Sequence, residues 1–141
     1  MKKLKRLLSS RRGESSYISM VVFVLVAVMF IALILNLFSV ISAKQQLDIC
    51  ADQLTRQIQL SGEVGADTET LFNMLKTNIG GVKNVSYQVD TTYCKGQRIQ
   101  LGTPFQVTVT AEAALGGFGD ISLFRITLKS SAAGVSEEYW K

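Results

Sequence analysis

Apolar side chains dominate the first third of the chain without helical or strand-like periodicity. No Asp, Glu, Lys or Arg occurs between Ser15 and Ala43, a stretch called here the uncharged segment. As an α-helix it would extend about 43 Å, more than the ~30 Å hydrocarbon core of a bilayer. Buried helices of soluble proteins seldom contain such a run. The pattern therefore predicts one transmembrane helix.

Beyond the uncharged segment the pattern becomes amphipathic. No glycine or proline occurs from Ser15 to Ser61, so the sequence gives the helix no reason to end at the membrane surface. We therefore expect one continuous helix of about 45 residues that ends at Gly62 or Gly65. The apolar residues that recur at helical spacing predict a buried face. This face consists of Leu47, Cys50, Ala51, Leu54 and Ile58.

A short second helix is predicted over residues 67–78. Asp67 or Thr68 could cap its first turn, and Gly80-Gly81 would end it. Its apolar face would contain Leu71, Phe72 and Leu75.

In the last third of the chain, apolar and polar residues alternate with a period of two, which is typical of β-strands. The alternation is clean over Phe105–Ala113 and weaker over residues 85–89 and 121–128, with Ile99–Leu101 as a shorter candidate. Its phase slips near Phe124, which predicts a β-bulge. Alternation of this kind predicts an antiparallel sheet with one covered face, and the amphipathic helix is the natural cover.

Together these patterns predict an α+β fold: a long N-terminal transmembrane helix that continues as an amphipathic helix packed on a small antiparallel β-sheet. The predicted parts are a basic leader (1–13), the transmembrane helix (14–43) and an α+β domain (44–141). A length of 141 residues suits one small domain and an anchor.

The net charge of +4 is concentrated before the uncharged segment. Residues 1–14 contain six basic residues and one acidic residue, whereas acidic residues slightly outnumber basic ones in the rest. The positive-inside rule then keeps the leader in the cytoplasm and places residues 44–141 outside it. We therefore expect a single-pass protein of the plasma membrane. Its basic leader suits membrane lipid as a partner, rather than nucleic acid.

Removal of the N-terminus as a secretory signal is an alternative. However, the apolar run is about twice as long as the usual 7–15 residues of a signal core. The best small-residue exit, Ile41-Ser42-Ala43, has a bulky Ile where a small residue is preferred. Both observations favour retention of the helix.

The two cysteines, Cys50 and Cys94, are candidates for a disulfide. Cys50 lies on the apolar helix face and Cys94 at the end of the first strand, and both are expected outside the cytoplasm, where disulfides persist. A bridge would close a loop of about 45 residues and stabilise the domain by roughly 4 kcal/mol. The alternative is two free thiols, one of them in the core.

The chain has no histidine, which removes the common zinc sites and the Ser-His-Asp and Cys-His catalytic arrangements. The adjacent Glu137 and Glu138 would point to opposite faces of a strand. We therefore expect no enzyme activity, no bound metal and no cofactor.

Asn36 is the one strongly polar side chain deep in the uncharged segment. In lipid, an interhelical hydrogen bond from such a side chain contributes roughly 0.6–2 kcal/mol. Asn36 is therefore a candidate for helix–helix packing between subunits. The alternative is that it bonds to its own helix or lies near the outer interface.

The sequence Arg11-Arg12-Gly13-Glu14 resembles the leader of type IV pilins and of their tight-adherence relatives. This resemblance implies that a prepilin peptidase cuts after Gly13 on the cytoplasmic face, so that the mature chain begins at Glu14. In those pilins a glutamate usually lies five residues after the cut, where this chain has Ile18.

Over its full length the chain is similar to a TadE-like family of small bacterial membrane proteins related to tight-adherence pseudopilins. The stretches Arg12–Ile18 and Gly134–Lys141 carry the likeness. It implies a minor pilin or pseudopilin of a pilus or secretion apparatus, with other pilin-like subunits and an assembly platform as partners. The alternative is a membrane-anchored extracellular binding domain that does not polymerise.

Overall fold

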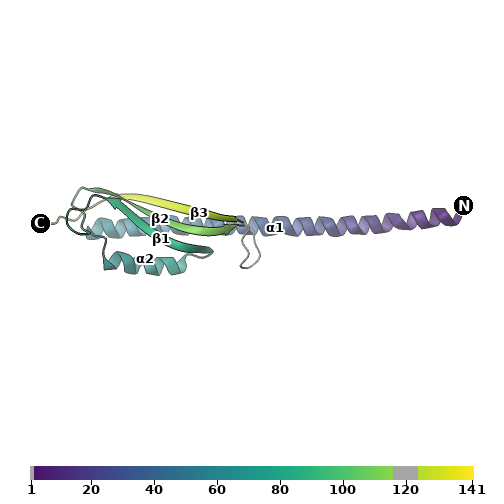
Figure 1. Cartoon of the computed structure of the whole chain (residues 1–141), viewed down its shortest axis with the longest axis horizontal. Helices are drawn as coiled ribbons and strands as arrows, with labels where there is room; N and C mark the ends of the chain where they lie inside the picture. Colours follow the sequence, from purple (N-terminus) through teal and green to yellow (C-terminus); the bar gives the residue numbers. More distant parts are fainter. Residues whose placement is uncertain (1, 116–123) are drawn as a thin grey trace. The chain divides into compact units, whose positions relative to one another are not determined.

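The computed structural model describes residues 2–115 and 124–141, with two helices and three strands in these ranges (Figure 1). The elements are α1 (Lys2–Ser61), α2 (Ala66–Asn78), β1 (Val82–Thr91), β2 (Pro104–Leu115) and β3 (Phe124–Val135). The chain divides into two compact units, residues 1–36 and 37–141. The second is called the folded unit, and it contains the end of α1, α2 and the sheet.

The first unit consists of helix α1 alone. Its side chains between Tyr17 and Leu35 are largely exposed, including Phe23 and Phe30 at 74% and 63%. Within the described ranges, one helix is long and apolar enough to cross a membrane, judged by length and composition. Helix α1 already begins at Lys2, so the predicted leader continues the helix rather than preceding it. A single glycine at position 13 costs a helix only about 1 kcal/mol, too little to end it.

In the folded unit, α1 buries the face that its periodicity predicts. Its five predicted residues are each at most 1% exposed, namely Leu47, Cys50, Ala51, Leu54 and Ile58. The helix ends at Ser61 because Gly62 adopts a φ of +64°, which glycine tolerates. The Gly62 N–H donates to the Ile58 carbonyl at 2.8 Å and closes the last turn.

Helix α2 agrees with its predicted range to within one residue, but its predicted cap is wrong. The N-cap residue is Gly65, which has no side chain to donate or accept a capping bond. Thr68 is instead buried, and Asp67 lies in the first turn, where a negative charge complements the helix dipole. Phe72 of α2 packs on Tyr87 of β1 with ring centroids 4.7 Å apart.

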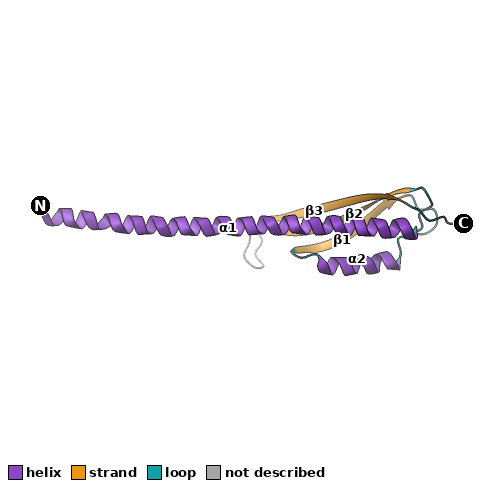
Figure 2. Ribbon diagram, turned by 180° about the vertical axis from the view of Figure 1, so that it is seen from behind, coloured by secondary structure: helices purple, strands orange, loops and turns teal. Residues whose placement is uncertain are grey.

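The three strands form an antiparallel sheet in the order β1-β2-β3, and α1 covers one of its faces (Figure 2). The alternation in β2 correctly predicts which of its side chains are covered. These are Phe105, Val107, Val109, Ala111 and Ala113. The α+β prediction is therefore confirmed at the level of a long apolar N-terminal helix, a short helix and a small antiparallel sheet.

Over its described residues, Phe124–Val135, β3 has no bulge. The register between β2 and β3 is unbroken from Leu115↔Phe124 to Pro104↔Val135. The irregularity lies in β1, between Lys83 and Ser86, where Asn84 has a φ of 54°. Of the predicted run over residues 121–128, Ile121 and Leu123 lie outside the described residues.

The short run Ile99–Leu101 is a loop rather than a strand. Ile99 is fully buried, and its N–H donates to the Gly62 carbonyl at 2.7 Å. Ile99 is apolar because it packs against the end of α1. A pattern of only three residues cannot distinguish such a buried loop from a strand that pairs in a sheet.

Candidate interaction surfaces

Among the residues that the structure describes, two grooves on the folded unit each contain one titratable side chain. A groove of about 480 Å³ lies between the end of β1 and the start of β2, with Asp90 in its lining. A groove of about 270 Å³ lies between α1 and α2, with Cys50 in its lining. Within the described ranges, no three His, Cys, Asp or Glu residues converge in a geometry that could hold a metal ion.

The groove between α1 and α2 is mainly apolar. The Gln46 side chain of α1 closes one end by accepting the Gly80 N–H at 3.0 Å. Burial raises the pKa of the Cys50 thiol to about 11, so the thiol is protonated and weakly nucleophilic near neutral pH. Cys50 therefore acts as a packing residue.

The predicted disulfide is absent, because Cys50 and Cys94 are both free thiols. The Cys94 N–H donates to the Arg98 carbonyl at 2.9 Å, and neighbouring Ile99 bonds to Gly62, so this loop lies against the end of α1. Cys50 lies about 18 Å further back along the helix axis. A disulfide tolerates a Cα separation of only about 7 Å. The sequence does place Cys50 on a buried helix face, but it does not show how far along the helix the loop of Cys94 is held.

Asn36 bonds to its own helix, and its predicted role in helix–helix packing stays a prediction. Its side-chain amide donates to the Ala32 carbonyl at 2.8 Å. Such a bond satisfies one donor without a partner helix and leaves the Oδ1 acceptor for an interhelical contact.

Gly13 and Glu14, the predicted cleavage position, have helical backbone within α1. Peptidases bind the segment that they cut in an extended form, so cleavage here requires the first turns of α1 to open.

The C-terminal residues Ser136–Lys141, called here the C-terminal strap, bind across the end of the folded unit where α1 stops. This end is called here the far end, and it contains Gly62, Ile99, Ser136 and Trp140. The Ser136 hydroxyl donates to the Ile99 carbonyl at 3.0 Å, and the Glu137 N–H donates to the Gln59 carbonyl at 3.0 Å. Both bonds join the tail to segments distant in sequence. The tail thus fixes the loop around Ile99 to α1.

Trp140 is the centre of the far end. Its indole Nε1–H donates to the Gly62 carbonyl at 3.1 Å, and its backbone exchanges two hydrogen bonds with the Gln100 amide. The Arg98 guanidinium lies 4.2 Å from the Trp140 ring, within cation–π distance. Its partners Gly62 and Gln100 follow only from the tertiary structure.

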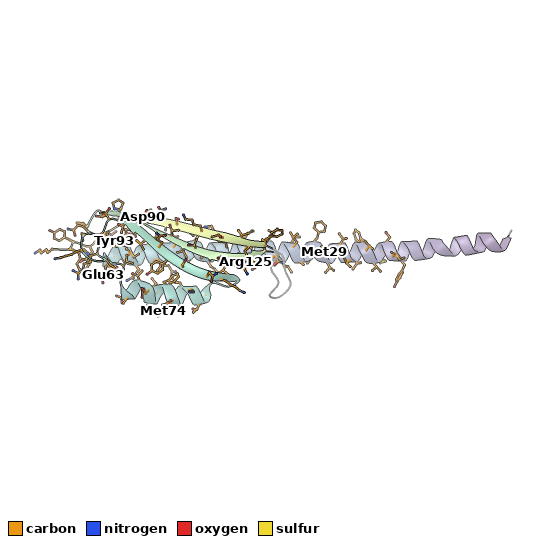
Figure 3. The ribbon with its side chains drawn as sticks, in the orientation of Figure 1. Met29, Glu63, Met74, Asp90, Tyr93 and Arg125 are labelled. Atoms are coloured by element: carbon orange, nitrogen blue, oxygen red, sulfur yellow. The ribbon has the colours of Figure 1, made fainter. Side chains whose placement is uncertain are left out.

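The opposite end of the folded unit, called here the near end, contains the start of β1 and of β3. A Cβ built on Gly81 would lie 3.0 Å from the Ser39 hydroxyl, so the start of β1 touches α1 there. Phe124 at the start of β3 is 67% exposed, and the neighbouring Arg125 is also exposed. Figure 3 shows Arg125 and Glu63 at opposite ends of the sheet.

The profile of one protein family matches residues 24–141, which is most of the chain. The family is described as a domain of unknown function, DUF4320. The chain belongs to the DUF4320 family. No curated protein and no solved structure matches it.

The DUF4320 match begins inside the uncharged segment and extends through the C-terminal strap. It therefore includes the far end with Gly62 and Trp140, and the near end with Phe124. The cleavage-like stretch Arg12–Ile18 lies before the matched residues. What DUF4320 membership adds is that the uncharged segment and the folded unit occur together as one family unit.

Proposed function

We propose that this chain is a non-enzymatic, single-pass membrane protein that acts as a minor pilin-like or pseudopilin-like subunit of a pilus or secretion apparatus. Its N-terminus lies in the cytoplasm and its folded unit outside. Other pilin-like subunits and an assembly platform are its partners, and a prepilin peptidase processes it.

The observation that carries this proposal is the difference in side-chain exposure between the two parts of α1. Residues from Tyr17 to Leu35 expose apolar side chains around the helix, whereas Leu47 and Leu54 are fully buried in the folded unit. A subunit of this kind can exchange lipid for neighbouring helices at little cost, because both environments are apolar. The folded unit keeps its own core during that exchange.

The polar groups of the uncharged segment would then set the register between subunits. Asn36 keeps an acceptor after its bond to Ala32, and an interhelical bond to it contributes roughly 0.6–2 kcal/mol. Ile18 occupies the position where pilins usually carry a glutamate, so Glu14 would be the acid nearest the mature N-terminus. Alignment would therefore depend on Asn36 and on Glu14 rather than on a buried glutamate.

Processing is tested by the mass of the mature N-terminus after co-expression with a prepilin peptidase. We expect a chain that begins at Glu14 with the peptidase and at Met1 without it. Gly13→Leu should block the cut, and Ser10→Leu is the matched control that should leave it intact. An intact Met1 in the presence of the peptidase would overturn the pilin-type route.

Assembly is tested by disulfide cross-linking of single cysteines placed along the uncharged segment in membranes, in a Cys94→Ser background. A subunit interface on one face predicts cross-links that recur every three to four residues. Asn36→Leu should weaken them, and Leu33→Ile is the control. Uniformly absent cross-links would favour the plain anchor.

A second candidate function is a membrane-anchored binding domain that does not polymerise. The far end favours it, because Tyr93, Leu101 and Tyr139 are 40%, 53% and 60% exposed there. Aromatic side chains of this kind are common at the centres of protein interfaces. A monomeric, uncleaved protein that loses a partner on Tyr139→Ala would support this function over assembly.

A further inference from the structure

The near end of the folded unit carries apolar side chains that no other residue in the described ranges 2–115 and 124–141 covers. Residues 124, 126, 128, 130 and 132 share the face of β3 that packs on α1, where Ser130 is 4% exposed. On the same face Phe124 is 67% exposed and Ile126 is 39% exposed. The face of β3 that is buried at Ser130 thus becomes exposed towards Phe124.

The level of the near end along α1 follows from the contact between Gly81 and Ser39. Ser39 lies within the uncharged segment, about 7 Å before the first charged residue, Lys44. The surrounding helix residues are exposed and apolar, with Phe38 at 70% and Ile41 at 56%. The tip of the sheet is therefore level with a part of the helix that avoids water.

The length of the uncharged segment allows this level to be compared with the bilayer. The segment extends about 43 Å, and the hydrocarbon core occupies only ~30 Å of it. The headgroup regions add roughly 5–8 Å on each side. The last turns of the segment, including Ser39, consequently fall in the headgroup region or at its boundary with the hydrocarbon.

Basic side chains accompany the apolar ones at the near end. Arg125 and Lys83 are exposed on the opposite face of the sheet from Phe124. Glu112, the acid paired in register with Lys83, accepts a hydrogen bond from Asn84 at 3.1 Å. Phe and other apolar side chains on one face, with Arg and Lys on the other, are the composition of segments that lie in membrane interfaces.

We propose that the near end of the sheet, with Phe124 and Ile126 on one face and Arg125 and Lys83 on the other, inserts into the headgroup region of an anionic bilayer. The apolar side chains enter the acyl boundary, and the two cations bind lipid phosphates. This second contact holds the folded unit at one angle to the membrane. It rests on the membrane anchoring in the proposed function, but not on assembly or processing.

Brominated lipids, which quench tryptophan on contact, test the insertion in the full chain reconstituted into nanodiscs. Trp140 is bonded to Gly62 at the far end, about 35 Å along the axis from Ser39, so it is a built-in reference. Phe124→Trp adds a second tryptophan at the near end. We expect brominated lipid to remove about half of the emission of this variant and little of the parent emission.

Val135→Trp, at the other end of β3, is the matched control and should remain unquenched. If the Phe124→Trp variant does not fold, Leu115→Trp takes its place in the experiment, because Leu115 is paired with Phe124 in the sheet. Equal quenching at positions 124 and 135 would overturn the proposal. Emission from the Phe124→Trp variant that is blue-shifted but not quenched by bromine would also overturn the proposal. The tryptophan would then lie in an apolar environment that is not lipid, such as a contact with a second copy of the protein.

The charge component is tested with Lys83→Glu and Arg125→Glu together in the Phe124→Trp background. In bilayers in which about one third of the lipid is phosphatidylglycerol, we expect the ratio of membrane-inserted to non-inserted near ends to fall at least about fivefold. In purely zwitterionic bilayers the change should be small, and equal losses in both would refute phosphate binding. A chain that fails to enter nanodiscs refutes the anchoring itself, whereas an embedded chain without quenching at 124 refutes this inference alone.

Discussion

The two halves of α1 are both helical but differ in how far the folded unit covers their apolar side chains. Between Tyr17 and Leu35 the side chains are exposed, with Leu33 at 53%, whereas Leu54 in the second half is 0% exposed. The first half is apolar around its circumference, so no single protein face could cover it. The second half is apolar on one stripe only, and one sheet covers that stripe.

The difference shows that hydrophobic content does not predict burial by protein, whereas periodicity does. A stripe at helical spacing predicts a protein partner, and an unbroken apolar circumference predicts a lipid or helical one. Variants in the two halves should therefore have unequal effects on the folded unit.

The largest effect is expected from Leu54→Ala. Truncation of this fully buried side chain should lower the free energy of unfolding of the folded unit by about 2–4 kcal/mol, because it leaves a cavity between α1 and the sheet. Leu33→Ala, in the exposed half, should change it by less than about 0.5 kcal/mol. Denaturant unfolding followed by Trp140 emission measures both, and equal losses would break the comparison.

Gly134→Ala should have the next largest effect. A Cβ at Gly134 would lie 2.8 Å from Phe105 Cζ and from Thr55 Cγ2, so β3 would be pushed away from α1. Overpacking of this kind costs about 1–3 kcal/mol. Gly80→Ala is the control, since nothing lies within 4 Å of its Cβ position. An unchanged melting temperature for Gly134→Ala would contradict the close contact.

Trp140→Phe should loosen the end of α1. It removes the hydrogen bond to the Gly62 carbonyl, which contributes about 1 kcal/mol, and weakens the stacking of Arg98. Amide exchange near Gly62 should accelerate accordingly. Tyr139→Phe, at an exposed neighbour, should leave exchange unchanged, and equal acceleration in both variants would show that the strap is not centred on Trp140.

Asp48→Asn should produce a smaller, pH-dependent effect. Hydrogen bonds from Lys44 and then Ser130 lower the pKa of the Asp48 carboxyl from its ordinary value of 3.8, so its ionised form stabilises the folded unit above that pH. The pair is half exposed, so we expect a loss of about 0.5 kcal/mol at pH 7.

The difference between wild type and Asp48→Asn should disappear as the pH falls below 3.8 towards the lowered pKa, because the carboxylate becomes protonated in the folded state as well. Urea titrations at pH 7 and at acid pH measure it. A difference that persists in acid would assign the effect to shape rather than to charge. Asp52→Asn on the same helix is the exposed control.

The smallest effect is expected from Cys94→Ser. Because both thiols are free, stability under oxidising conditions should change by close to zero, whereas loss of a disulfide would cost roughly 4 kcal/mol. Iodoacetamide should label Cys94 in the folded protein and both cysteines only after unfolding. If Cys94 reacts with iodoacetamide only after treatment with reductant, the predicted disulfide between Cys50 and Cys94 would be supported after all.

The elements with regular local patterns were predictable from the sequence. The stripe that includes Leu47 and Leu54 and the alternation that includes Val107 and Val109 each repeat several times, so the period identifies both the element and its buried face. Gly62 predicts the end of α1 because few other residues adopt its conformation.

The second half of β3 was not predictable from local pattern. Ser130, Ala132 and Gly134 are small or polar, yet they lie on the face that packs on α1, and at Gly134 even a Cβ would clash with Phe105 and Thr55. The surfaces at the two ends were missed for a related reason. Trp140 and Phe124 are conspicuous in sequence, but what each one meets depends on where α1 stops and where the sheet begins.

The far-end strap has a consequence for biogenesis. Gln59 of α1 bonds to Glu137, 78 positions later in the chain, and β2 and β3 begin 50 and 70 residues after Leu54. At ~5–20 residues per second, roughly 4–16 seconds separate the synthesis of Gln59 from that of Glu137. During that interval the uncharged segment can already enter the membrane while the apolar stripe behind it has no partner. Biogenesis of this chain therefore requires something, a translocation channel or a chaperone, to shield the stripe until β2 and β3 arrive.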